Sequence, residues 1–206
     1  ANGHPALRTR ARAHHELLDH AKGPLLRPFR AFDTARVAHL LTVANGTINL
    51  RTGELLPHDP AHLITRESPV VFDPNAAGEF AARLLEIFRG EAELADWFRR
   101  EIGMAATGFD QAKRVYFLCG DLERPDANGD NGKSLVVDTI RAALGSYVGG
   151  IKSALLCRAS FDRDAHSHDA GRQGLIGSRL ALGAEFPTGS RLNDAEFNEV
   201  SGGEPI

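Results

Sequence analysis

The sequence contains few cysteines, no long apolar run and little net charge, and each of these features excludes a class of protein. Its two cysteines, Cys119 and Cys157, form no CxxC pair, which excludes a disulfide framework and favours the reducing cytoplasm. Without a run of about 18 apolar residues, no segment is expected to span a membrane. The formal charge of −3 shows no overall basic excess, so any surface that binds nucleic acid has to be local.

Residues 1–31 are expected to form a helical, locally basic segment. A helix is expected over residues 12–22, where His15 and His20 stand five positions apart. A zinc-protease helix needs its two histidines four positions apart, so a surface helix is the better interpretation. The basic side chains fit a solvated helix face better than a DNA-binding surface; they are Arg8, Arg10, Arg12, Lys22, Arg27 and Arg30.

Residues 32–108 are expected to form a small mixed α+β domain. Residues 40–57 alternate short apolar or β-branched runs with glycine-containing turns, which is typical of a β-meander. Two helices with buried apolar stripes are expected to follow, the first ending at Gly90 and the second at Gly103. Their apolar positions are Phe80, Leu84, Ile87 and Phe88 in the first and Leu94, Trp97, Phe98 and Ile102 in the second. A domain boundary is expected near Gly108.

Residues 109–206 are expected to form an α/β domain with the parallel sheet of an AAA-like P-loop NTPase. Residues 115–119 form a continuous apolar run, which is typical of a buried parallel strand. A glycine-rich loop follows, and a helix is expected from about Lys133 to Leu144. Backbone N–H groups in such a loop and the positive end of the helix bind phosphate well.

The residues expected to bind ATP are Gly129, Asp130, Asn131, Gly132, Lys133 and Ser134. Lys133 is predicted to act catalytically by reaching the β- and γ-phosphates, and the Ser134 hydroxyl is predicted to ligate Mg²⁺. Ala127 stands where the usual pattern has its first glycine, so the loop departs from the standard form. The alternative is a surface turn that happens to read NGKS, but the flanking strand and helix favour the phosphate loop.

A P-loop site needs an acidic residue at the end of a neighbouring strand, and Glu185 ends the mostly apolar segment of residues 179–185. In an open parallel sheet it would face the Mg²⁺–phosphate site and act as a catalytic base. The alternative is an exposed glutamate at a strand end. A cluster of acidic residues and histidines lies between the two motifs, and its irregular spacing favours a polar loop over a metal site; it comprises Asp162, Asp164, His166, His168 and Asp169.

Several further segments carry a resemblance to a known family. They are VANGTINLRTGELLPHDPAHLIT at 43–65, GMAATG at 103–108, NGKS at 131–134, GSRLALGAEFPTGSRLN at 177–193 and SGGE at 201–204. From about Phe32 to its last residue, the chain resembles the phage/plasmid primase–helicases, whose motor is a superfamily 3 helicase related to the poxvirus primase–helicases. Asn49 and Asn198 depart from that pattern, where the family usually has an aspartate and, near Asn198, a lysine.

The resemblance implies an ATP-dependent DNA helicase of replication, in the cytoplasm, working as a hexamer on single-stranded or forked DNA. It also implies a primase domain upstream and an arginine finger downstream, so we expect the chain to be truncated at both ends and inactive alone. Two alternatives stay open. One is another P-loop ATPase, terminase-like or AAA-type, and the other is a degenerate nucleotide-binding scaffold of replication.

Overall fold

The chain forms two compact units in the computed structural model, Ala1–Phe32 and Asp33–Ile206. The structure describes residues 27–76, 78–109, 114–120, 131–158, 175–186 and 188–201. In the first unit the described part holds one short 3-10 helix, η1 (Phe29–Ala31). The helix predicted over residues 12–22 lies outside the described residues. All contacts below belong to the second unit.

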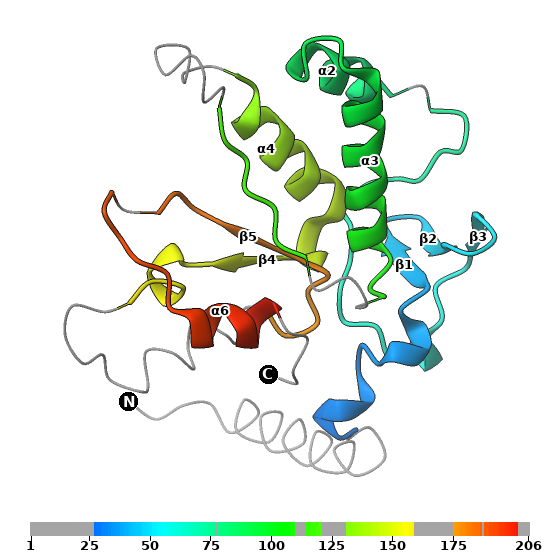
Figure 1. Ribbon diagram of the computed structural model, residues 1–206. Coiled ribbons are helices and arrows are strands. Elements are labelled where there is room, and N and C mark those ends of the chain that lie inside the picture. Colours follow the sequence, from blue (N-terminus) through cyan, green and yellow to red (C-terminus); the bar gives the residue numbers. More distant parts are fainter. Residues whose placement is uncertain are drawn as a thin grey trace, which may run out of the picture. The chain divides into compact units, whose positions relative to one another are not determined.

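An antiparallel sheet of three strands, in the order β1-β2-β3, opens the second unit (Figure 1). Its strands are β1 (Leu40–Val43), β2 (Gly46–Asn49) and β3 (Glu54–Leu56). The turn between β2 and β3 is closed by side chains, since the Asn49 carboxamide accepts from Arg51 N–H and the Thr52 hydroxyl from Glu54 N–H. The predicted β-meander is therefore confirmed. Two 3-10 helices flank it, η2 (Ala35–Val37) and η3 (Pro60–His62).

Two amphipathic helices follow, α2 (Phe80–Ile87) and α3 (Ala92–Ala106), where the apolar stripes predict them. The second stripe is only partly buried, because Leu94 and Trp97 remain exposed. The predicted end of the second helix at Gly103 is wrong. An interior glycine costs a helix only about 1 kcal/mol, and packing of the residues on both sides outweighs it. The helix ends where the Thr107 hydroxyl donates to the Met104 carbonyl and Gly108 takes a φ of +65°.

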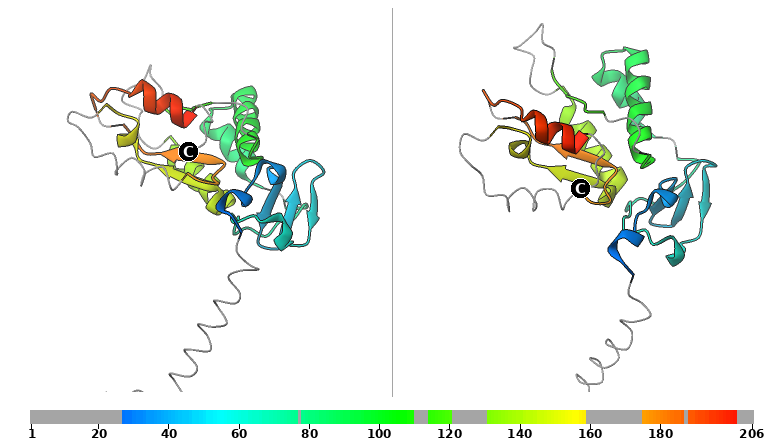
Figure 2. Two further views of the ribbon diagram at one scale, coloured as in Figure 1. Left: turned by 90° about the horizontal axis from the view of Figure 1, so that it is seen from below. Right: turned by 60° about the horizontal axis from the view of Figure 1, so that its bottom comes forward.

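The second half of the unit is built around a parallel pair of strands. It contains α4 (Lys133–Leu144), η5 (Gly145–Tyr147), β4 (Val148–Ile151), η6 (Ser153–Leu155), β5 (Leu180–Gly183) and α6 (Asp194–Ser201). Strands β4 and β5 pair in parallel and run side by side in Figures 1 and 2. Val200 of α6 packs on the small core beneath them, with Ile151 and Leu155. The described residues thus form a mixed α/β structure with one antiparallel and one parallel sheet.

The buried strand predicted at residues 115–119 is not found. Residues 114–120 form no strand, and Val115, Phe117 and Leu118 are 44%, 58% and 41% exposed. Among the described residues the parallel sheet consists of β4 and β5 alone, and this apolar run pairs with neither of them. Continuous apolar character therefore did not produce a buried strand here.

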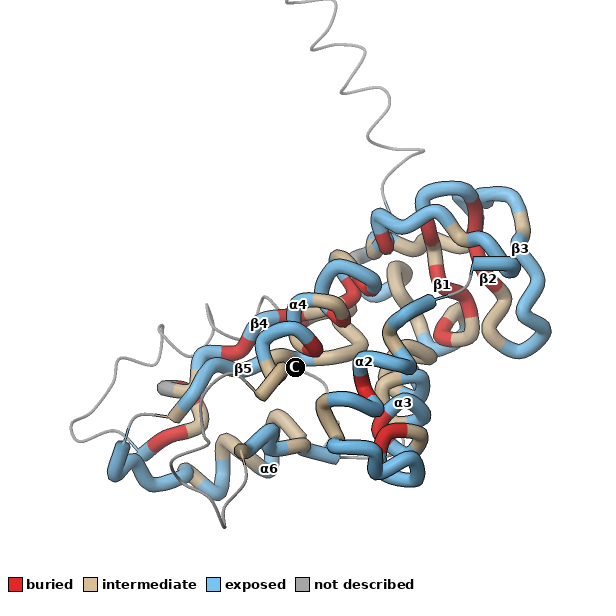
Figure 3. The backbone as a smooth tube through the Cα atoms, turned by 90° about the horizontal axis from the view of Figure 1, so that it is seen from above, coloured by how far each residue is buried: buried red, intermediate tan, exposed pale blue. Residues whose placement is uncertain are grey.

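One apolar core joins the antiparallel sheet to α2, α3 and α4, and Figure 3 shows buried stretches on these elements. Its buried members are Leu41, Val43, Ile48, Leu84, Ala95, Phe98, Val136, Ile140, Leu144 and Tyr147. Tyr147 is only 1% exposed, and its hydroxyl accepts a hydrogen bond of 2.9 Å from the backbone N–H of Thr42. Residues on both sides of the boundary expected near Gly108 thus share this core.

Arg179 connects three parts of the unit just before β5. Its guanidinium lies 4.3 Å from the centroid of the Tyr147 ring and donates to the carbonyls of Ala106, at 2.6 Å, and of Leu40. Burial lowers the pKa of Arg179, because desolvation disfavours the charged form. A cation at the C-terminal end of α3 also complements the helix dipole. Arg179 therefore ties α3 and β1 to the start of β5.

Candidate functional site

The described members of the predicted phosphate-binding set lie at the first turn of α4. Gly132 is the N-cap residue of that helix, with a φ of +77°, and Lys133 is its first residue. A Cβ atom at position 132 would lie 2.5 Å from Cγ1 of Ile87 in α2. Glycine is therefore required twice, for the left-handed backbone and for the close approach of α2.

Lys133 and Ser134 lie at the positive end of the α4 dipole. Nζ of Lys133 donates to Oδ1 of Asn131 at 2.6 Å, and Ser134 is exposed. Gly132 has no side chain to accept from the first-turn N–H groups, and no side-chain cap is formed. A cation, a hydroxyl and backbone donors are thus present at one helix end, an arrangement suited to an anion such as phosphate.

Four of the six predicted nucleotide-binding residues are described in this turn, namely Asn131, Gly132, Lys133 and Ser134. Gly129 and Asp130 lie outside the described residues, as does Ala127. The acidic and histidine cluster at residues 162–169 also lies outside them. Within the described ranges, no group of three or more His, Cys, Asp or Glu side chains could hold a metal ion.

Glu185 lies two residues beyond the end of β5. Its side chain is exposed and makes no hydrogen bond or ion pair with any residue that the structure describes. The parallel pairing of β5 with β4 puts the carboxyl ends of both strands at one edge, and Glu185 follows that edge. No described contact joins Glu185 to Lys133 or Ser134, so its predicted catalytic role stays a prediction.

A groove of about 270 Å³ lies between α2 and α4, next to the first turn of α4. It is lined by Glu79, Phe80, Arg83, Ile87, Leu135, Val136 and Thr139. The sequence reasoning missed this groove. Its one signal is Leu135, an apolar residue outside the buried α4 stripe that stays 52% exposed.

Three side chains hold the segment that leads toward the loop. Glu101 of α3 accepts hydrogen bonds from Arg114 and from the hydroxyl of Tyr116. The Tyr116 ring in turn packs edge-on against Trp97, with centroids 5.9 Å apart. The hydrogen bond from Tyr116, and then that from Arg114, lowers the pKa of Glu101 below its ordinary value of 4.5. α3 therefore anchors residues 114–120 although they form no strand.

This carboxylate predicts a pH dependence of stability. A depressed folded-state pKa stabilises the fold above the unfolded value of 4.5, and this contribution is lost as the pH falls through the folded value. Glu101→Gln should therefore be less stable than wild type at pH 7, and the difference should shrink as the pH falls below 4.5. Urea unfolding of both proteins at pH 7 and pH 3.5 measures it. A difference independent of pH would contradict the assignment.

Aromatic rings connect residues 114–120 to α6 and to the residues after β5. Phe117 stacks on Phe197 of α6, with centroids 6.4 Å apart and planes at 4°, and its centroid lies 6.2 Å from that of Phe186. Asn198, which stands where the resemblance leads us to expect a lysine, is exposed on α6. Phe186, which follows β5, and Phe197 of α6 therefore lie close to residues 114–120, which precede the glycine-rich loop.

Comparison with known proteins bears on the N-terminal part of the chain. Residues 9–89 match the family model described as D5 N terminal like. This domain is the N-terminal domain of phage/plasmid primase–helicase proteins, which act in replication. The D5 N terminal-like region contains the antiparallel sheet and α2, and its match ends before α3 and α4. No curated protein matches the chain.

The part of the chain that the structure describes also bears on membrane association. None of its helices is both long enough and apolar enough to cross a bilayer.

Proposed function

We propose that the chain is the nucleotide-binding part of an ATP-dependent DNA helicase in a phage/plasmid-type primase–helicase. The observation that carries the proposal is the start of α4, where Gly132 takes a left-handed backbone and Lys133 opens the helix. The D5 N terminal-like region upstream supports it, because that domain belongs to primase–helicase proteins.

ATP and Mg²⁺ are the ligands that fit these residues. Lys133 would exchange its hydrogen bond with Asn131 for the β- and γ-phosphates, where its charge offsets theirs. The Ser134 hydroxyl would ligate Mg²⁺, and Glu185 would orient the attacking water as base. When bound, Mg²⁺ neutralises charge that develops on the phosphates.

The groove between α2 and α4 is the expected place for the rest of the nucleotide. It begins at Leu135, the residue after Ser134, so a nucleotide whose phosphates lie at the helix end extends along it. Its lining combines apolar Phe80, Leu135 and Val136 with polar Thr139, which suits a ribose and a base. This continuity supports a nucleotide over inorganic phosphate alone.

The whole protein would use hydrolysis to unwind DNA during replication. A ring of six copies, each ATP lying between neighbours and completed by an arginine from the adjacent copy, follows from the family resemblance. Single-stranded or forked DNA is the expected partner, and the cytoplasm the expected location.

A second candidate is a scaffold of replication that binds nucleotide without hydrolysing it. Two observations favour it: Asn198 stands where the resemblance leads us to expect a lysine, and residues 114–120 form no paired strand. The two candidates differ in turnover. DNA-stimulated release of phosphate by the full-length protein supports the helicase, and tight ATP binding without turnover supports the scaffold.

The test of the site is the affinity for Mg²⁺-ATP, measured by calorimetry on this chain. Lys133→Ala should weaken binding about 10- to 100-fold, because a charged hydrogen bond contributes about 1.5–3 kcal/mol. Lys152→Ala is the matched control, since Lys152 is an exposed lysine beyond β4 and should leave the affinity unchanged. Equal affinity of wild type and Lys133→Ala would overturn the proposed site.

A further inference from the structure

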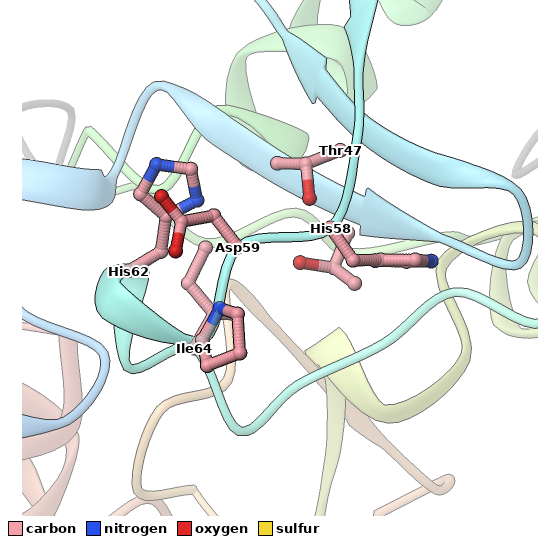
Figure 4. Close-up of a pocket in the computed structure, with 7 residues that line it drawn as sticks. Thr47, His58, Asp59, His62 and Ile64 are labelled. Atoms are coloured by element: carbon pink, nitrogen blue, oxygen red, sulfur yellow. The ribbon is translucent and has the colours of Figure 1, made fainter.

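A second cavity lies within the D5 N terminal-like region, away from α4. Thr42 of β1 and Thr47 of β2 are directly opposite each other in the antiparallel register. Both therefore point to the sheet face opposite the one that carries Leu41 and Val43 into the core. Residues 58–64 cross this outer face and line one side of a partly open cavity of about 200 Å³. Its lining comprises Thr42, Thr47, His58, Asp59, Pro60, His62 and Ile64 (Figure 4).

Thr47 is the residue that points to a ligand. It is only 2% exposed, and its hydroxyl has no hydrogen-bond partner anywhere in the described part of the chain. Figure 4 shows that hydroxyl directed into the space between Asp59 and His58. A buried hydroxyl without a partner is destabilising, so such groups in native proteins call for a partner or a function. One ordered water takes about 30 Å³, so the cavity has room for a larger molecule.

The loop that lines the cavity is held by a local cap and by hydrogen bonds to Asp33. Asp59 is the N-cap of η3 and accepts from the backbone N–H of Ala61 at 2.8 Å. Leu63 ends η3 with a left-handed φ of +52°, and its carbonyl accepts from Asp33 N–H at 3.1 Å. The carboxylate of Asp33 accepts from Thr65 N–H at 2.9 Å. The cavity is therefore formed before any ligand arrives, which lowers the entropic cost of binding.

The charges of the lining restrict the chemistry of the ligand. No lysine or arginine lines the cavity, and the carboxylate of Asp59 would repel an anion, so phosphate does not fit. A metal ion does not fit either, because the described residues offer no group of three suitable ligands. A neutral, flat molecule with a hydrogen-bonding edge fits this lining. The imidazole of His62 offers a flat surface beside the apolar ring of Pro60, and the hydroxyls of Thr42 and Thr47 can bond its edge.

We propose that this cavity binds a single nucleobase. Unpaired bases are recognised in proteins by stacking on flat side chains and by hydrogen bonds to their edges, which are the groups that the cavity presents. The Thr47 hydroxyl gains its missing partner from the base edge, and His62 contacts the ring. The base belongs either to a single strand or to a free nucleoside. The site is separate from the first turn of α4 and does not depend on ATP binding there.

The test uses oligonucleotides of ten thymidines, adenosines or cytidines, and an abasic strand of the same length. Anisotropy measurements on the full chain carrying Lys133→Ala exclude binding at α4. The unbroken strands should bind at least 10-fold more tightly than the abasic strand, which keeps the phosphates and lacks the bases. Thr47→Val preserves the shape of the side chain and should abolish that difference. Thr188→Val, at an exposed threonine, should preserve it.

Two further measurements complete the test of the cavity. His62→Ala alters the loop without touching the sheet and should also reduce the preference for bases, which covers the case in which Thr47→Val fails to fold. Calorimetry with thymidine, adenosine and cytidine separates the sources: binding of nucleosides but not of strands assigns the cavity to free nucleosides. Equal binding of normal and abasic strands together with no binding of nucleosides overturns the proposal, and so does an unchanged preference in folded Thr47→Val.

Discussion

Gly145→Ala is expected to lower the free energy of unfolding of the Asp33–Ile206 unit by about 2–5 kcal/mol. Gly145 takes a φ of +54° and a ψ of −126°, a combination that side chains avoid. An added Cβ would lie 2.4 Å from Cδ of Pro69 and 2.7 Å from the carbonyl oxygen of Glu67. The second contact is with backbone, so it cannot be relieved by rotating a side chain. Strain and overpacking therefore add at this position.

Gly53→Ala is the matched control. Gly53 also has a positive φ, of +75°, but an added Cβ meets no atom within 4 Å. Its replacement should cost only the left-handed conformation, about 1–2 kcal/mol. Guanidinium unfolding of both variants measures the difference between them. Equal losses would show that the contact between η5 and residues 67–69 is not tight in solution.

Tyr147→Ala is the second change with a large expected effect. Removing a buried aromatic side chain costs about 3–5 kcal/mol, from lost apolar burial and from the cavity that remains. Tyr147 also supports Arg179 through its ring and receives the N–H of Thr42 at its hydroxyl. The variant should unfold at a clearly lower denaturant concentration than wild type.

Tyr147→Phe separates the two parts of that effect. It keeps the ring beneath Arg179 and removes only the acceptor for Thr42 N–H, so a loss of about 1–3 kcal/mol is expected. Urea unfolding followed by circular dichroism compares the three proteins. A phenylalanine variant as unstable as the alanine variant would mean that the hydrogen bond, and not the packing of the ring, dominates.

Local patterns predicted α2, α3, α4 and the meander, because periodicity and turn chemistry act over short stretches. The stripe through Leu84 and the stripe through Ile140 both reach the core. The same reasoning failed at residues 115–119, since a parallel strand depends on a partner distant in sequence. It also ended α3 too early at Gly103, because tertiary packing overrides the weak preference of a single glycine.

In the candidate site, too, the local features could be predicted and the long-range contacts could not. The start of α4 at Lys133 could be predicted, because glycine followed by a helical stripe is a local signal. The contact of Gly132 with Ile87 and the joint at Arg179 could not, since both connect residues far apart in the sequence. The outer cavity was missed for the same reason: nothing in the sequence shows that Thr47 is covered by residues 58–64.

The shared core has a consequence for how such chains can be recombined. The match to the D5 N terminal-like family model stops at residue 89, yet the core that contains Leu84 and Ile48 also contains Phe98, Ile140 and Tyr147. The region that matches the family model is therefore smaller than the unit that shares this core. A chimaera that joins this region to a different motor has to bring α3, α4 and the turn at Gly145 with it, or supply new apolar surface of the same shape.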